Sequence, residues 1–220
     1  MNKRRLITEH TALAVVDMQN YYLLKESSYC RYFNSLQHGC LDYIINRCFN
    51  LVLPNIKKII GFFEENGLPV FYLRLCSARA DRSDLHRFFK ETNQNGVEKG
   101  FKDIYPLQGS EMAEIHDEIK PDKGAIIIDK TTYSPFTSTR IKTILLELSV
   151  NQIVFTGLAT SQCVETTARD ASDHGFSVIH IEDAQADYEE LAHISSLYSS
   201  KGVCGGLIMS TEELLSSASK

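Results

Sequence analysis

The stretch from Val154 to Val164 constrains the fold of this chain more than any other segment. Its β-branched and apolar residues stop at Gly157, small and polar residues follow, and a helical pattern begins with Cys163 in its first turn. An apolar run of this kind is typical of a buried strand, here leading through a turn into a helix. The question for the rest of the chain is whether this strand–helix unit repeats.

Further apolar runs with the composition of buried strands flank this unit. With the run at 152–156 they fall at residues 11–18, 69–75, 124–130, 176–183 and 206–209. Helical patterns separate many of them, at residues 54–66, 110–119, 139–148, 163–174 and 188–200. Because crossovers between parallel strands are right-handed, this alternation predicts a three-layer α/β/α sandwich around a mainly parallel, Rossmann-like sheet of about six strands.

The length of 220 residues suits a single domain, 1–220, that can bury a sizeable core. Two segments depart from the alternation. Residues 21–50 are rich in aromatic side chains and are expected to mix loop with helix. Residues 76–108 are polar, carry both signs of charge, and are expected to form a long surface loop, of the kind that often serves as a lid or a subunit contact.

The composition excludes several classes of partner. A net charge of -5 argues against a general nucleic-acid or anionic-membrane binder, because such proteins need a basic patch. No apolar run approaches the length that spans a bilayer, and the start lacks the apolar core of a signal peptide. The six cysteines show no C-x-x-C spacing, so neither a zinc ribbon nor a thioredoxin-like site is expected. These observations predict a soluble, cytoplasmic protein that acts on a small molecule.

Three chemically active side chains stand at the ends of predicted strands: Asp17, Lys130 and Cys163. Carboxyl ends of parallel strands share one edge of the sheet, where ligands bind in open α/β folds, so these side chains are expected to converge. A carboxylate and an ammonium together can activate a thiol, and a helix N-terminus favours its thiolate. Taken singly, each has a plainer interpretation: a capping acid, a solvated lysine, and an inert buried thiol.

The residues around these positions carry a family resemblance. The segments VVDMQN (15–20), DKTTYSPFTST (129–139) and TGLATSQCVETTARDASDHGFSV (156–178) resemble the cysteine hydrolases of the isochorismatase-like superfamily. That superfamily includes nicotinamidases, N-carbamoylsarcosine amidohydrolases and amidases of ureido and carbamoyl compounds. The resemblance covers the chain apart from residues 21–50 and 76–108, and implies hydrolysis of a C–N bond through a thioester.

The resemblance also assigns roles. It implies that Asp17 is the general base, Lys130 the stabilising cation and Cys163 the nucleophile. The backbone N–H groups of Ala159 and Cys163 would form the oxyanion hole, and the Leu158–Ala159 peptide bond would be cis. A cis bond without proline costs several kcal/mol and persists only where the surrounding structure enforces it.

The resemblance also bears on metal binding, cofactor binding and oligomeric state. Nicotinamidases bind a divalent metal through an Asp-x-His motif, and Asp84 and His86 have that spacing, but they lie well beyond the second strand. We therefore predict no metal and no cofactor. The family commonly forms dimers or tetramers, which predicts a homodimer or homotetramer here.

Residues that contact the substrate are harder to identify from sequence. Arg74 at the second strand is a candidate for holding a substrate carboxylate. Tyr133 and Phe136 follow Lys130 closely, and Thr160 lies in the turn before Cys163, so all three are candidates for the pocket wall. Tyr21, Tyr22 and Phe33 are further candidates, although core packing is the more common role of aromatic side chains.

Other functions compete with the amidohydrolase. One is a catalytically idle relative that binds a ligand or senses redox state through its thiols, and the intact Asp–Lys–Cys set argues against it. Isochorismatases proper cleave a vinyl ether and lack the cysteine, so Cys163 counts against that activity. A nucleotide-binding oxidoreductase is disfavoured because the turn after the first strand reads DMQN and not G-x-G-x-x-G.

Overall fold

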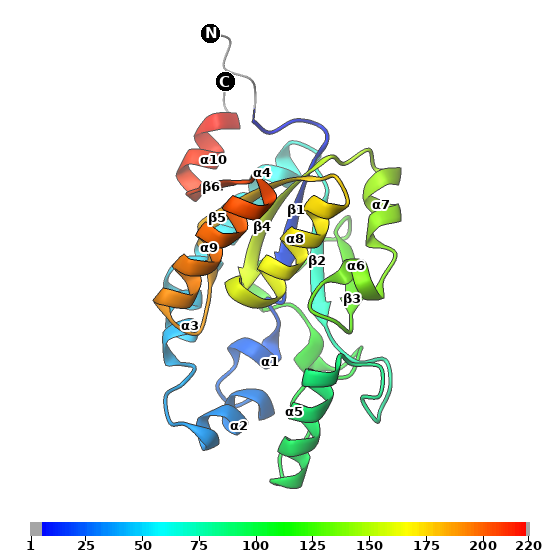
Figure 1. The fold of residues 1–220 in the computed structure, drawn as a ribbon, viewed down its shortest axis with the longest axis vertical. Helices are drawn as coiled ribbons and strands as arrows, with labels where there is room; N and C mark the ends of the chain where they lie inside the picture. Colours follow the sequence, from blue (N-terminus) through cyan, green and yellow to red (C-terminus); the bar gives the residue numbers. More distant parts are fainter. Residues whose placement is uncertain (1–5, 219–220) are drawn as a thin grey trace.

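A computed structural model describes residues 6–218 of the chain and contains one six-stranded sheet (Figure 1). Its strands are β1 (Thr11–Val16), β2 (Val70–Leu75), β3 (Ile126–Lys130), β4 (Gln152–Leu158), β5 (Ser177–Ala186) and β6 (Leu207–Met209). The strand order is β3-β2-β1-β4-β5-β6, and every neighbouring pair is parallel. The predicted fold class is therefore confirmed.

The central strand β1 is buried on both faces, which explains its unbroken apolar sequence. Leu13 and Val15 belong to one hydrophobic core, and Ala12, Ala14 and Val16 belong to the other. Successive side chains of a strand point to opposite faces, so one strand supplies both cores. Helices must cover each face to keep this apolar surface from water.

Helices cover both faces of the sheet. On one side lie α3 (Asp42–Arg47), a π-helical turn (Cys48–Val52), α4 (Leu53–Glu65) and α10 (Thr211–Ala218). On the other lie α6 (Pro135–Ser138), α7 (Ile141–Glu147) and α8 (Glu165–Asp173), and α9 (Glu190–Cys204) runs beside α8 (Figure 1). None of the helices within residues 6–218 is long and apolar enough to cross a membrane.

Three helices lie beyond the carboxyl ends of the strands: α1 (Asn20–Leu23), α2 (Ser28–Leu36) and α5 (Arg87–Glu98) (Figure 1). The helix α5 corrects the expectation of a long surface loop at 76–108, because Phe89, Thr92 and Gly96 form a narrow buried stripe on it. The prediction of a helix over residues 110–119 is also wrong. Two short 3-10 turns, Glu111–Ala113 and Asp117–Ile119, replace it.

Candidate active site

The site begins at the point where the strand order reverses, between β1 and β4. Asp17 directly follows β1 and adopts a φ of 51°, a left-handed conformation that is uncommon for residues other than glycine. Beside it, Gly157 of β4 pairs with Val16 and has a φ of 103°. A Cβ at Gly157 would collide with the backbone of Val16, so only glycine lets the two strands approach so closely here.

Asp17, Lys130 and Cys163 converge as their strand-end positions predict. The ammonium Nζ of Lys130 lies 2.9 Å from Oδ2 of Asp17 and 3.3 Å from Sγ of Cys163. It also donates to the carbonyl oxygen of Thr132 at 3.2 Å. Lys130 extends from β3, two strands away from β1, and its side chain is fully buried. The cation therefore holds the carboxylate and the thiol together inside the protein.

Burial dominates the electrostatics of these three groups. It raises the pKa of Asp17 above its usual value, although the charge of Lys130 acts in the opposite direction. Burial would lower the pKa of Lys130, but the negative charge of Asp17 and the hydrogen bonds to Asp17 and Cys163 outweigh this effect, so the pKa of Lys130 is raised. Burial and then the Asp17 charge raise the pKa of Cys163. Both effects favour the protonated thiol over the thiolate.

One oxygen of the Asp17 carboxylate is free to accept a proton. Oδ1 of Asp17 is buried and has no hydrogen-bond partner among the described residues. Oδ2 is already engaged by Lys130. A carboxylate with one free oxygen next to a protonated thiol is arranged to accept its proton when the sulfur attacks.

The turn that carries Cys163 is held from outside by the segment after β5. The Asp187 carboxylate accepts from the backbone N–H of Ser161 at 2.6 Å, and the Ser196 hydroxyl donates to the carbonyl of Thr160 at 3.1 Å. Nδ1 of His193 lies 2.8 Å from the hydroxyl of Thr160. Burial and the neighbouring Arg47 lower the pKa of His193 to about 4, so this histidine is neutral near pH 7.

One expectation at this turn is wrong. All peptide bonds within residues 6–218 are trans, including Leu158–Ala159. The chain reverses direction by other means: Gly157 has a positive φ, Ala159 is extended, and a π-helical turn spans Thr160–Val164. These conformations make the turn without the energetic cost of a cis bond.

A cavity of about 610 Å³ opens onto these residues. Asp17, Ala159 and Cys163 lie in its wall, with Leu75 beside them. Much of the remaining wall is aromatic: Tyr21, Tyr22, Tyr29, Phe33, Phe88, Phe89, Tyr105 and Tyr188. The volume suits a small organic ligand, and Cys163 belongs to the wall that such a ligand would contact.

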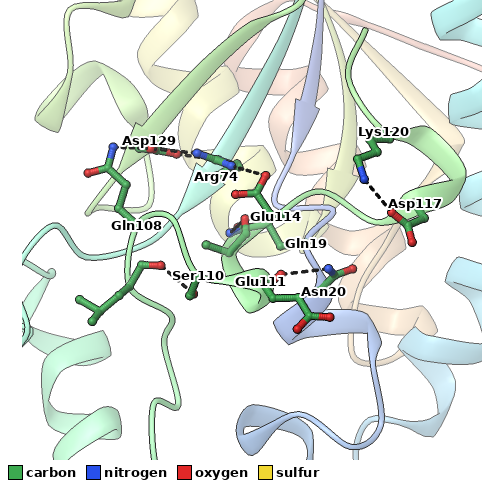
Figure 2. A network of polar contacts seen from close by, with 12 residues as sticks. Gln19, Asn20, Arg74, Gln108, Ser110, Glu111, Glu114, Asp117, Lys120 and Asp129 are labelled. Carbon is green, nitrogen blue, oxygen red and sulfur yellow. Dashed lines mark hydrogen bonds and ion pairs between the residues drawn. The ribbon is translucent and has the colours of Figure 1, made fainter.

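Arg74 lies outside the wall of this cavity. Figure 2 shows its guanidinium between Asp129, bound at 2.7 and 3.1 Å, and Glu114, bound at 2.9 Å. Gln108 donates to the same Asp129 carboxylate at 2.8 Å. Arg74 therefore ties β2 to β3 and to the segment that precedes β3, and all three of its guanidinium nitrogens donate to carboxylates of the protein.

The other candidate wall residues are also set back from the cavity. Tyr133 packs against His86 and Phe89, and Phe89 itself lines the cavity. Phe136 packs against His174 and Phe176 in the core on the side of α8. Thr160 is buried and bonded to His193.

The Asp84 and His86 pair has structural roles that do not fit a metal centre. The Asp84 carboxylate accepts from the Ser77 hydroxyl and from the backbone N–H of Ala78. Nδ1 of His86 accepts from the N–H of Phe88 and caps α5. Over residues 6–218, no group of three or more His, Cys, Asp or Glu side chains is arranged to hold a metal ion.

Sequence reasoning missed the contribution of the segment after β5. Asp187 and Tyr188 follow β5 at the same edge of the sheet as Asp17 and Cys163. The rule that places ligands at the carboxyl ends of parallel strands would have identified this pair, had it been applied to the fifth strand. Tyr29 and Tyr105 gave no comparable signal, because their segments lack a regular pattern.

Two curated proteins resemble this chain over most of its length. Nicotinamidase 3 of Arabidopsis thaliana is 28% identical over 200 residues, covering 89% of this chain and 82% of that protein. The ureidoacrylate amidohydrolase RutB of Acinetobacter baylyi is 28% identical over 219 residues, covering 91% and 81%. Both relatives are hydrolases by name.

Solved structures share the fold. An isochorismatase family protein from Desulfovibrio vulgaris superposes with a TM-score of 0.78 at 21% identity, covering 97% of this chain and all (100%) of that one. The N-carbamoylsarcosine amidase from Thermoplasma acidophilum superposes with a TM-score of 0.65 at 24% identity, covering 92% and 96%. The isochorismatase domain matches residues 11–213, and the chain belongs to that family.

Proposed function

We propose that the protein is a cysteine amidohydrolase that cleaves a C–N bond of a small amide, carbamoyl or ureido compound. The observation that carries the proposal is the position of the Lys130 ammonium, 2.9 Å from Asp17 and 3.3 Å from Cys163, next to a cavity of ligand size. Relatives named nicotinamidase and ureidoacrylate amidohydrolase support the same class of reaction.

The first half of the reaction forms a thioester and releases an amine. Asp17 takes the proton of the Cys163 thiol as Sγ attacks the carbonyl carbon, and the C=O π electrons move onto the oxygen. Ala159 and Cys163 both line the cavity, and their backbone N–H groups would bind this oxyanion. The C–N bond then breaks, and the nitrogen leaves as ammonia or an amine with the proton from Asp17.

The second half returns the enzyme to its starting state. Asp17 removes a proton from water, the resulting hydroxide attacks the thioester carbonyl, and the C–S bond breaks. The sulfur leaves as thiolate and regains its proton from Asp17, and the acid product departs. Lys130 contacts both the carboxylate and the sulfur, so its positive charge stabilises whichever of them is negative at each step.

The experiment that tests the proposal measures release of ammonia from a panel of primary amides, carbamoyl compounds and ureides. Wild-type protein should hydrolyse at least one class, and Cys163→Ala should lower kcat by at least about 10³-fold, because a triad without its nucleophile retains little activity. Cys204→Ala is the matched control, since Cys204 lies outside the cavity wall. Undiminished turnover by Cys163→Ala would refute the assignment of the nucleophile.

We further propose a cytoplasmic homo-oligomer. The six cysteines are all free, which fits a reducing compartment. On α9, Leu191, Ile194 and Tyr198 follow one another at helical spacing and are all exposed, at 73%, 42% and 69%. An apolar stripe of this kind is suited to pack against a second copy of the chain.

A further inference from the structure

The buried histidine of α9, His193, lies between α3 and the turn that carries Cys163. Its Nδ1 is 2.8 Å from the hydroxyl oxygen of Thr160, and its Nε2 is 3.2 Å from Nη2 of Arg47. The residue is only 4% exposed, and it is not part of the cavity wall. Because it does not reach a ligand in the cavity, His193 can affect the reaction only through the residues that it contacts.

Arg47 anchors this histidine to the central sheet. The guanidinium Nε of Arg47 donates to the carbonyl oxygen of Gln185 at 3.0 Å, and its Nη2 donates to that of Glu182 at 3.1 Å. Both carbonyl groups belong to β5, which pairs with β4 in the sheet. A planar guanidinium that is bonded at several points has little freedom to move. The imidazole of His193 therefore links a strand of the sheet to the nucleophile turn.

Thr160 is the residue through which this link reaches the proposed chemistry. It opens the π-helical turn and directly follows Ala159, whose N–H belongs to the proposed oxyanion hole. Thr160 is 1% exposed and is held twice, by His193 at its hydroxyl and by the Ser196 hydroxyl at its carbonyl oxygen. A shift of Thr160 would move Ala159 on one side and Cys163 on the other. Misplacing reacting groups by about 1 Å can lower a rate about 10²-fold.

The imidazole of His193 is neutral near pH 7, which suits a positioning role. Burial and then the positive charge of Arg47 lower the pKa of His193 to about 4, and the negative charge of Asp187 opposes this shift without reversing it. A neutral imidazole has one donor and one acceptor nitrogen, so it can bond to a hydroxyl without placing a second cation against Arg47. The link therefore stays intact at the neutral pH at which hydrolysis is measured.

We propose that His193 is a positioning residue of the hydrolase. It fixes the Thr160 hydroxyl, and through it the turn that presents the N–H of Ala159 and the sulfur of Cys163 to the substrate. This inference rests on the proposed function, because the role of His193 is read in the rate of hydrolysis. Since His193 lies outside the cavity wall, its loss should slow the chemical step and leave substrate binding nearly unchanged.

A second histidine of the chain supplies a matched control. His180 of β5 is 1% exposed, and its Nε2 lies 2.8 Å from the hydroxyl of Ser200 on α9. Burial lowers the pKa of His180 to about 4, the same value as for His193. The two histidines thus match in burial, in ionisation and in their bond to a hydroxyl, but only the bond of His193 reaches the nucleophile turn. A purely structural role would give their variants the same effects.

Steady-state kinetics with an amide that the wild-type protein hydrolyses test the inference, together with unfolding in urea. We expect His193→Phe to lower kcat about 10²-fold and to change KM by less than about twofold. His180→Phe should leave kcat within about threefold of the wild-type value. Both variants lose a buried hydrogen bond, so both should lose similar stability toward urea.

Two further variants separate the lost bond from a general disturbance of packing. Thr160→Val has nearly the shape of threonine, removes the same bond from its other end, and should lower kcat by a similar factor even if His193→Phe does not fold. The double variant should lower kcat no further, because both changes delete one interaction. His193→Asn places an amide near the position of Nδ1 and should recover at least about tenfold of the lost kcat.

An unchanged kcat in Thr160→Val, an effect of His193→Phe confined to KM, or an equal fall in kcat for His180→Phe would overturn the inference. So would additive losses in the double variant. Each of these outcomes leaves the proposed function in place. That function is refuted separately, by a wild-type protein that releases no ammonia from the panel or by retained turnover in Cys163→Ala, and the inference then falls with it.

Discussion

Asp17 shows which properties of a single site residue can be predicted from the sequence and which cannot. Its position after an apolar run predicts that it lies at the ligand edge of the sheet, and the structure places it 2.9 Å from the Lys130 ammonium. The left-handed φ of Asp17 and the free Oδ1 were not predictable, because both depend on contacts between strands distant in sequence. The raised pKa of Cys163 likewise follows from burial, which sequence reveals only after the fold is known.

The pH dependence of catalysis follows from these shifts. Asp17 must be ionised to accept the thiol proton, so kcat/KM should fall as the pH drops through a carboxyl pKa higher than the usual 3.8. Because burial raises the pKa of Cys163, no new thiolate forms near the pKa of about 8.5 of a free cysteine. A profile of kcat/KM from pH 4 to 10 should therefore be flat between about pH 7 and pH 9.

A profile that rises steadily between those two pH values would contradict this account. Such a rise would mean that a free thiolate is the reactive form and that Asp17 is not the base. The reaction of a small thiol compound with the corresponding ester, followed over the same range, supplies the reference curve for a free thiolate.

At the scale of elements, the unit formed by β4, the turn and α8 is the best predicted part of the molecule. Its strand, its glycine and its helix are all visible in the sequence as a buried run, a breaker and a helical pattern. The trans Leu158–Ala159 bond and the π-helical turn at Thr160–Val164 were not foreseen, since many backbone routes connect the same strand to the same helix. The surrounding packing selects one of them.

Gly157 is the element's most sensitive position. Replacement by alanine should lower the free energy of unfolding by at least about 2 kcal/mol, because φ is 103° and the new Cβ would collide with the Val16 backbone. Urea unfolding measures the effect. Gly61→Ala in α4 is the control, since nothing lies within 4 Å of its Cβ position, and it should be neutral or stabilising. Equal stability of the two variants would show that β1 and β4 need not approach so closely.

At the scale of the whole molecule, the parallel sheet was predictable because each buried strand has its own apolar run. The helix α5 was not predictable, because it buries only Phe89, Thr92 and Gly96 and most of its other residues are polar. The aromatic residues of 21–50 were recognised as unusual, but their common destination at the cavity depends on how α1 and α2 pack over the strand ends. The packing of irregular segments against distant parts of the chain produces no hydrophobic periodicity from which it could be predicted.

At this scale, a measurement of self-association tests whether the apolar stripe of α9 forms the contact between copies of the chain. Sedimentation velocity at micromolar concentration should detect a dimer or tetramer, and Leu191→Glu should shift it toward monomer because a charge would be buried at the interface. Val97→Glu is the matched control, since Val97 is also exposed, at 53%, and lies on α5, which Figure 1 shows apart from α9. A monomeric wild-type protein, or equal dissociation by both variants, would exclude α9 as the contact.

The central claim is that Cys163 becomes acylated during turnover, and mass spectrometry of the quenched protein and its peptides tests it most directly. The protein is mixed with an amide that it hydrolyses, quenched in acid within milliseconds, and digested to locate the adduct. The account predicts an added acyl group on Cys163 that appears before the acid product accumulates and is absent from Cys163→Ala. Steady-state hydrolysis with no acyl group on Cys163 at any time, together with retained activity of Cys163→Ala, would contradict it.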